Sequence, residues 1–342
     1  MTKIVSIKDI ARLVGVSHST VSRALRASPV VNAETAGRIR KAAQQHGYRA
    51  SLIGRGLVMR RSMTLGCVAT DIADPFVAGV VAGIEEVANQ QGYAVFLASS
   101  HADPQRELDV VRTFHERRVD GVIVPASRVG SLYLPHLAEL RIPIVLINNQ
   151  HSGTYTYSVS IDNVGAAQRI TRHILELGHQ RIAYIGNRSG SQADADRLSG
   201  FRIELRRAKV PFFPRLVMHA DATPESGRAI MQRLLALRYR PTAVFCYDDL
   251  TALGALAAAY AEGISVPGEL SVAGFDDLFV ASYTAPPLTT IRQPMKQMGQ
   301  RATEILLALL RGETAKKSVR FSGELIVRES TARPRFSGRQ RS

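Results

Sequence analysis

The stretch SIKDIARLVGVSHSTVSRAL, residues 6–25, decides how the chain begins, because it predicts two short helices joined by a tight turn. Ser6 and Asp9 stand three residues apart before an apolar run at helical spacing, which is typical of a capping box. Gly15 ends that helix, and Ser17 can cap the next one. Two amphipathic helices separated by so short a turn are the pattern of a helix-turn-helix.

The second helix of this stretch has two chemically different faces. Val21, Ala24 and Leu25 form one apolar stripe, and short polar side chains and arginines occupy the other side. Such a polar face fits close approach to base edges and phosphates in the major groove. A third helix, from the cap Asn32 to about residue 46, completes a small bundle ended by Gly47. Because plain bundles share this pattern, it leaves both DNA binding and a purely structural bundle open.

Charge is concentrated at the start of the chain. The 342 residues carry a net charge of +15 and suit two or three domains. Residues 1–62 contain twelve basic and two acidic side chains, so this segment alone holds +10 of the total. A solvated basic face is the alternative, but such asymmetry favours nucleic acid as the partner.

The remaining bulk features predict an intracellular protein. The only two cysteines, Cys67 and Cys246, each lie in an apolar run that reads as a buried strand, which fits a reducing compartment. The first residues are too polar for a signal peptide, and no apolar run approaches a membrane span. We therefore expect a cytoplasmic, nucleoid-associated protein without a membrane partner.

From Met63 onward, strand-like apolar runs alternate with segments of helical periodicity, which predicts parallel sheets with crossover helices. About nine strands are expected, and the rhythm restarts near Asp162, which favours two comparable lobes. A ligand would bind between them, beyond the carboxyl ends of the strands. The expected strands contain TLGCVA, AVFLAS, GVIVPA, IPIVLIN, YSVSID, RIAYIG, LVMHA, AVFCYD and SVAGFD, and helices are expected near 76–91, 104–117 and 131–141.

Residues 6–51 resemble the headpiece of the lactose-repressor (LacI/GalR) family of bacterial transcription factors. They share D-I-A-x-x-x-G-V-S-x-x-T-V-S-R, V-x-x-x-T-x-x-x-I and G-Y, and LGHQRIAYIG, PTAVFCYDDLTALGAL and PPLTTIRQP extend the likeness to about Ala332. The resemblance implies an all-α helix-turn-helix headpiece and an α/β two-lobed periplasmic-binding-protein-like core of parallel sheets flanked by helices. The implied domains are a headpiece at 1–50, a hinge helix or linker at 51–62, an effector-binding and dimerisation core at 63–334 and a disordered basic tail at 335–342. Within the core, lobe one is expected at about 63–161 and 292–321, and lobe two at about 162–291 and 322–334.

By position, the resemblance also implies which headpiece residues touch DNA. His18 and Ser19 stand where family members read bases, and Arg26 stands where the family usually has Asn. Other positions contact phosphates or base edges, or support the backbone beside phosphate. These further positions are Ser6, Thr20, Ser22, Arg23, Asn32 and Tyr48.

The resemblance places a DNA-ordered hinge after the headpiece. Arg55 and Leu57 match the family's A-R-x-L, whose leucine inserts into the minor groove. Gly54 and Gly56 each cost about 1 kcal/mol of helix propensity, so we expect this hinge to order only on DNA. A simple flexible linker is the alternative.

The residues expected to bind the effector lie at the ends of predicted strands of the core. Asp276 and Arg197 match the family's effector-binding aspartate and arginine, and Asp248 stands where the family commonly has Asn. Ionised Asp only accepts hydrogen bonds, whereas Asn also donates, so this difference bears on ligand preference. The expected effector-binding residues are Asp74, Phe76, Asn148, Arg197, Asp248, Asp276 and Gln293.

Each of these residues has a structural alternative. Asp248 or Asp249 can simply cap the following helix, and Phe76 can be a core residue. Arg197 can pair with an aspartate of its own helix turn, Asp194 or Asp196.

The function that the resemblance implies is a dimeric, ligand-controlled repressor that binds a palindromic operator in double-stranded DNA, without a cofactor or metal. The effector is expected to be a sugar or sugar derivative, with sugar acids and purines still open, as is its sign as inducer or corepressor. Asp248 and Asp276 resemble a glycosidase pair, but no catalytic motif accompanies them, so no enzyme is expected. A sugar-binding module without a DNA-regulatory role is the other rival. The homodimer is implied by the resemblance, and because no leucine heptad follows Thr331, a tetramerising coiled coil is not expected.

Overall fold

The chain folds as two compact units, Met1–Met63 and Thr64–Ser342, which we describe separately. In the described part of the chain, no helix combines the length and apolarity that a membrane crossing needs. The computed structural model describes residues 5–48, 61–126, 142–148 and 156–335.

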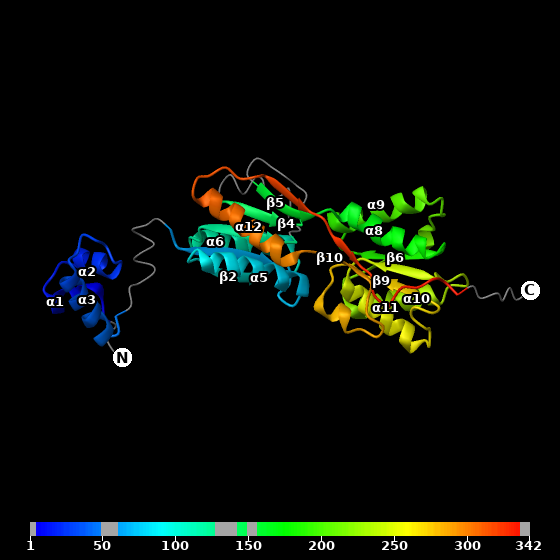
Figure 1. Ribbon diagram of the computed structural model, residues 1–342, viewed down its shortest axis with the longest axis horizontal. Coiled ribbons are helices and arrows are strands. Elements are labelled where there is room, and N and C mark those ends of the chain that lie inside the picture. Colours follow the sequence, from blue (N-terminus) through cyan, green and yellow to red (C-terminus); the bar gives the residue numbers. More distant parts are fainter. Residues whose placement is uncertain (1–4, 49–60, 127–141, 149–155, 336–342) are drawn as a thin grey trace, which may run out of the picture. The chain divides into compact units, whose positions relative to one another are not determined.

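The described residues of the first unit form three helices, and each begins at the residue that the sequence predicted. Ser6 caps α1 (Ile7–Val14) in a complete capping box with Asp9, and Gly15 follows in the left-handed conformation at φ 73°. The next two helices are capped by Ser17 and Asn32, whose side chains accept from backbone amides three residues on. These helices are α2 (His18–Leu25) and α3 (Ala33–Gln45) (Figure 1).

The core of this unit is small and aliphatic. Ile10, Val21 and Ile39, one from each helix, are fully buried, and Ala24 completes the predicted stripe on α2. Because α1 and α2 bury one face each against α3, the opposite face of α2 is left to solvent. The helix-turn-helix prediction is confirmed.

The second unit begins with a six-stranded sheet in the order β11-β5-β4-β3-β1-β2, whose strands are all parallel. One face is covered by α6 (Pro104–Glu116), and the helices α5 (Pro75–Gln90) and α12 (Met295–Leu310) pack against each other. The strands are β1 (Thr64–Ala69), β2 (Ala94–Ser99), β3 (Gly121–Pro125), β4 (Ile144–Ile147), β5 (Thr156–Ile161) and β11 (Ser318–Phe321).

A second parallel sheet has the order β7-β6-β8-β9, which repeats the arrangement β2-β1-β3-β4 of the first sheet. The helices α8 and α9 lie on one side of this sheet and α10 and α11 on the other (Figure 1), and alternate residues of its strands pack against the two sides. Its strands are β6 (Ile182–Asn187), β7 (Val217–Ala220), β8 (Ala243–Cys246) and β9 (Ser271–Ala273), and its helices are α8 (Asn163–Glu176), α9 (Gln192–Arg207), α10 (Pro224–Leu235) and α11 (Asp249–Ala261).

All nine predicted strands are present, and the structure adds three that the sequence analysis missed. The strand β11 extends the first sheet, and β10 (Thr290–Arg292) pairs antiparallel with β12 (Glu324–Ile326) in a ribbon of its own. The helices expected near 76–91 and 104–117 are confirmed, whereas the one expected at 131–141 lies outside the described residues. The fold class, a helical headpiece followed by a parallel α/β core, is therefore confirmed.

Both cysteines are buried and free, as their apolar surroundings predicted. Cys67 lies in β1 and Cys246 in β8. Burial raises the pKa of the Cys67 thiol to about 12, so it is a structural rather than a reactive group.

Candidate functional site

The exposed face of α2 carries most of the polar residues that the sequence analysis assigned to DNA. His18, Ser19, Arg23 and Arg26 are exposed, while Thr20 is half-buried at the start of the helix. Short hydroxyl side chains and two long cations therefore share one surface, as groove binding requires.

Hydrogen bonds preorganise part of this face. The Ser17 Oγ lies 2.7 Å from the Ser19 Oγ and 2.8 Å from the Thr20 Oγ1, so three hydroxyls form one cluster. One turn later, Arg26 donates from Nη2 to the Ser22 Oγ at 2.6 Å. Arg26 also occupies the C-cap position of α2.

The remaining headpiece candidates have visible structural roles. Ser6 and Asn32 cap helices, and the half-buried Tyr48 packs against the headpiece core, where burial raises the pKa of its phenol. Arg55 and Leu57 lie outside the described residues.

In the second unit, Arg197 is the centre of a buried polar cluster. This side chain of α9 is only 2% exposed, and its Nε donates to the Asn163 Oδ1 at 3.0 Å. Its Nη1 donates to the Tyr247 carbonyl at 2.5 Å, and its guanidinium carbon lies 3.6 Å from the centre of the Phe275 ring. The alternative pairing with Asp194 is not formed, because that carboxylate accepts from Tyr184 and from a backbone amide. Arg197 thus contacts three segments besides its own helix: the start of α8 and the residues that follow β8 and β9.

A continuous chain of polar contacts leads from Arg197 to the first sheet. Its Nη2 lies 3.9 Å from Asp276 Oδ1, which also accepts a 2.5 Å hydrogen bond from the Gln293 Nε2. The Gln293 Oε1 in turn accepts from the Asn148 Nδ2 at 3.5 Å. Asn148 follows β4 and Asp276 follows β9, so the chain joins the carboxyl ends of strands from both sheets.

Backbone conformation marks the same two residues. Asp276 has φ 120° and Asn148 has φ 57°, values that L residues adopt rarely. Strain of this kind costs about 1–3 kcal/mol and gathers at functional sites. Backbone hydrogen bonds hold both conformations: the Asp276 amide donates to the Ile291 carbonyl at 2.7 Å, and the Asn148 amide donates to the Val159 carbonyl at 2.8 Å.

The core contains two pairs of adjacent aspartates, and in each pair the two residues have different roles. Asp249 and Asp277, the second members, hold the fold: Asp249 accepts from Thr290 Oγ1 and the Leu278 amide, and Asp277 pairs with two arginines. The first members, Asp248 and Asp276, belong to the cluster. Asp248 also caps α11, accepting from the Thr251 amide at 2.7 Å, so its structural reading holds as well.

Asp74 and Phe76 lie at the start of α5, after β1. Asp74 caps that helix through the Phe76 amide at 2.9 Å. Phe76 is only 5% exposed, which favours its alternative reading as a core residue.

Burial governs the protonation of the carboxylates here. It raises the pKa of Asp276 well above its usual value, with the charges of Asp249 and Asp248 adding to the rise and Arg197 opposing it. It also raises the pKa of Asp248, and it raises the pKa of Asp74 to about 6, where the charge of Asp248 contributes. Asp248 is therefore coupled electrostatically both to Asp276 beside Arg197 and to Asp74 at the start of α5.

Sequence reasoning missed two members of the cluster. Asn163, the first residue of α8, and Tyr247, directly after β8, both contact Arg197. Their signal was their position, since each stands beside a strand end where polar or aromatic residues face a ligand. In the described residues, no group of three metal-ligating side chains is found.

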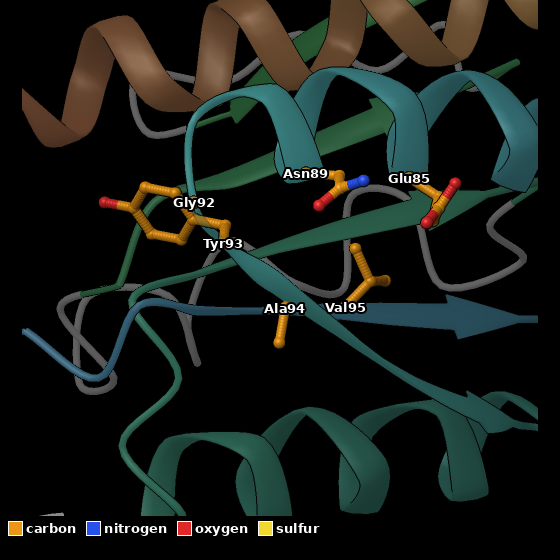
Figure 2. Close-up of a pocket in the computed structure, with 6 residues that line it drawn as sticks. All are labelled: Glu85, Asn89, Gly92, Tyr93, Ala94 and Val95. Carbon is orange, nitrogen blue, oxygen red and sulfur yellow. The ribbon is translucent and has the colours of Figure 1, made fainter. Parts of the chain in front are cut away.

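The surface hollow of about 440 Å³ shown in Figure 2 belongs elsewhere. It is lined by Glu85 and Asn89 of α5 and by residues at the start of β2, at the amino ends of the strands. Because α5 runs back along the sheet, these residues lie at the opposite end of that helix from Asp74. This hollow is distinct from the Arg197 cluster.

A helix-turn-helix unit and a two-sheet core with a buried polar cluster at its strand ends define the class of ligand-responsive DNA-binding regulators. Residues 6–51 match the model of bacterial regulatory proteins of the lacI family, and residues 171–331 match a periplasmic binding protein-like domain. The chain belongs to the LacI/GalR family of bacterial transcriptional regulators, and the predictions of family and of a regulator that is not an enzyme are confirmed.

Individual relatives agree over nearly the full length. The chain is 35% identical to the HTH-type transcriptional repressor CytR of Escherichia coli (strain K12), covering 95% of this chain and 96% of that one. A lac repressor dimer bound to operator and the anti-inducer ONPF matches with a TM-score of 0.89 and 26% identity, over 96% and 100% of the two chains. The complex of the transcriptional regulator CelR with cellobiose matches with a TM-score of 0.72 and 30% identity, over 95% and 99%.

Proposed function

We propose that this protein is a cytoplasmic, nucleoid-associated repressor that binds a palindromic operator as a homodimer and responds to a small molecule held by the Arg197 cluster. The observation that carries the proposal is the presence on one chain of a helix-turn-helix with an exposed polar face and of a buried polar cluster joining two sheets. A sugar-binding module without DNA binding would have no use for the first of these features.

The exposed face of α2 would lie in the major groove of the operator. His18 and Ser19 would read base edges, and Arg23 would contact phosphate or a base edge, in keeping with their exposure. The Ser17 hydroxyl cluster would fix Thr20 and Ser19 beforehand, which reduces the entropy lost on binding. Arg26, Ser22, Ser6, Asn32 and Tyr48 would support this surface or touch phosphate.

The core would hold the effector between two lobes. We divide it as the sequence suggested, with lobe one about 63–161 and 292–321 and lobe two about 162–291 and 322–334; the six-stranded and four-stranded sheets support this division. Asp74, Asn148, Arg197, Asp248, Asp276 and Gln293 would contact the ligand, with Phe76 behind them. The relative crystallised with cellobiose supports a sugar-like effector. Effector binding would alter operator affinity through residues 51–62, with Arg55 and Leu57 at the DNA.

Exposed apolar side chains support a homodimer. The edge strand β2 exposes Phe96 and Leu97, and a bare strand edge of this kind needs a cover. Tyr260, Phe279 and Tyr283 are also largely exposed on the same unit. A second copy of the chain would bury these surfaces.

Operator binding with a matched variant tests the proposal. Duplexes recovered from random DNA by the purified protein should bind wild type tightly, and Arg23→Ala should weaken that binding at least about tenfold through loss of a charged contact. The control is Arg106→Ala, an exposed arginine on α6, which should leave binding unchanged. Equal binding by all three proteins would contradict the assignment.

A further inference from the structure

We infer that the effector carries an amino nitrogen beside its hydroxyl groups, that an anionic group in the same place is rejected, and that Asp248 sets this preference. The inference rests on the proposed function, because it concerns the ligand of the same cluster.

The positive charge of the cluster is already used within the protein. Arg197 donates from Nε to Asn163 and from Nη1 to the Tyr247 carbonyl, and its remaining nitrogen faces Asp276 at 3.9 Å. The rings of Phe275 and Tyr247 lie against the guanidinium, at 3.6 and 4.4 Å from its carbon to the ring centres. A ligand carboxylate or phosphate would therefore find a cation whose donors are largely occupied.

Acceptors, by contrast, remain available. Within the described residues, the Asn148 Oδ1 is buried and accepts no hydrogen bond. Among the residues that the structure describes, Asp248 accepts from the Thr251 amide and Asp74 from the Phe76 amide, each in the helix that the aspartate caps. A buried acceptor without a donor is costly, so the ligand that completes this site is rich in N–H and O–H groups.

The balance of charge points the same way. Asp248 and Asp276, each only 7% exposed, are the two carboxylates that interact with the charge of Arg197, and Asp74 interacts with the charge of Asp248. The charge of Asp248 disfavours ionisation of both of the others, in addition to the effect of burial. An added anion would increase this repulsion, whereas a donor nitrogen, above all an ammonium, relieves it with charge-assisted hydrogen bonds.

Replacing Asp248 can change this ligand preference without disturbing the start of α11. It caps α11 through its carboxylate, and Asn caps helices as well as Asp does. Asp248→Asn therefore keeps the helix start and removes one negative charge. Asn also donates as well as accepts, so the variant should tolerate ligands that lack an amine.

Calorimetric titration of the full chain with matched probes tests the inference. The probes are D-glucosamine, D-glucose and D-glucuronate, together with adenosine and inosine, which differ by an amino and an oxo group. Wild type should bind at least one amine-bearing probe about tenfold more tightly than its neutral partner, the margin of a charge-assisted over a neutral hydrogen bond, and should not bind glucuronate. Asp248→Asn should abolish that margin, and Asp74→Asn should reduce it.

Asp221→Asn is the control, because it removes the same charge from an exposed ion pair with Arg188 and should leave the margin unchanged. Glucuronate binding as tight as that of the amine, an unaltered margin in Asp248→Asn, or no binding by either amine overturns the inference. A protein that binds its operator but prefers anions would keep the proposed function and lose only this inference.

Discussion

Arg197 holds the candidate effector site together through the geometry of its guanidinium. Its Nε and Nη1 bind two different segments, and its plane lies against Phe275. Lysine has the same charge but is a point donor without the planar fork. Arg197→Lys is thus expected to weaken effector binding at least about tenfold while operator binding without effector stays intact.

Calorimetry and operator titration on the same preparation check this prediction. Arg188→Lys, in the exposed pair with Asp221, is the control. A wild-type response to effector in Arg197→Lys would remove the arginine from the site.

The raised pKa of Asp74 predicts how the stability of the fold depends on pH. Burial raises its pKa to about 6, so its protonated form is favoured in the folded state. Stability from this group is fully present below the unfolded value near 3.9 and is lost as pH rises through about 6. Asp74→Asn should therefore melt higher than wild type above pH 6, and the difference should shrink toward pH 4. A constant difference across this range would contradict the assigned pKa.

The sequence pointed to two kinds of candidate site residue: residues that follow strand ends, and Arg197, which lies in a helix and was implied by the family resemblance. Asn148, Asp248 and Asp276 follow the buried strands β4, β8 and β9 within three residues, so their position at the carboxyl ends of the sheets followed from parallel topology. Asn163 and Tyr247 were missed because their role depends on Arg197, which reaches them from a helix far away in sequence. The roles of all these residues in binding stay predictions.

Local capping chemistry explains why the headpiece helices could be predicted to the residue. Ser6, Ser17 and Asn32 each accept from a backbone amide three residues on, an interaction that needs no distant partner. Replacing each of two glycines in this unit with alanine tests this local geometry, because the two replacements should change the stability of the headpiece in opposite directions.

Gly37 and Gly15 should respond oppositely to alanine. A methyl group at Gly37, inside α3, meets nothing within 4 Å, so Gly37→Ala should stabilise the headpiece by about 1 kcal/mol of helix propensity. Gly15 has φ 73°, so Gly15→Ala should destabilise it by about 1 kcal/mol. Thermal unfolding of a 1–63 fragment, followed by helical circular dichroism, measures both. Shifts of the same sign would show that another factor controls these positions.

Three strands, β10, β11 and β12, were not predicted, because their pairing depends on residues far away in sequence rather than on local chemistry. β10, β11 and β12 are short and each contains a charged residue, Arg292, Arg320 or Glu324, which breaks the apolar run. Their partners lie far away in sequence: β11 pairs with β5, and β10 with β12. Such short runs show no alternation of their own, and only tertiary pairing makes them strands. The predicted strands β4, β8 and β9 are equally short, but they were recognisable because they lie in nearly continuous apolar runs.

The exposed edge of the first sheet bears on the oligomeric state of the protein. The exposed Phe96 on the edge strand β2 should be covered by a second copy of the chain. Phe96→Glu places a charge there and should shift the protein from dimer to monomer in sedimentation, with weaker operator binding as a consequence. Phe279→Glu, on the other exposed apolar surface, tests whether that surface contributes too. A Phe96→Glu protein that remains dimeric would exclude the β2 edge from the interface.

Selection of random duplex DNA by the purified protein, at several salt concentrations, tests the central claim most directly. Because residues 1–62 carry +10 of the net charge, affinity for the selected sites should fall steeply as salt rises, with two half-sites related by a twofold axis. Recovery of no common sequence, together with no binding to any duplex at low salt, would contradict the account.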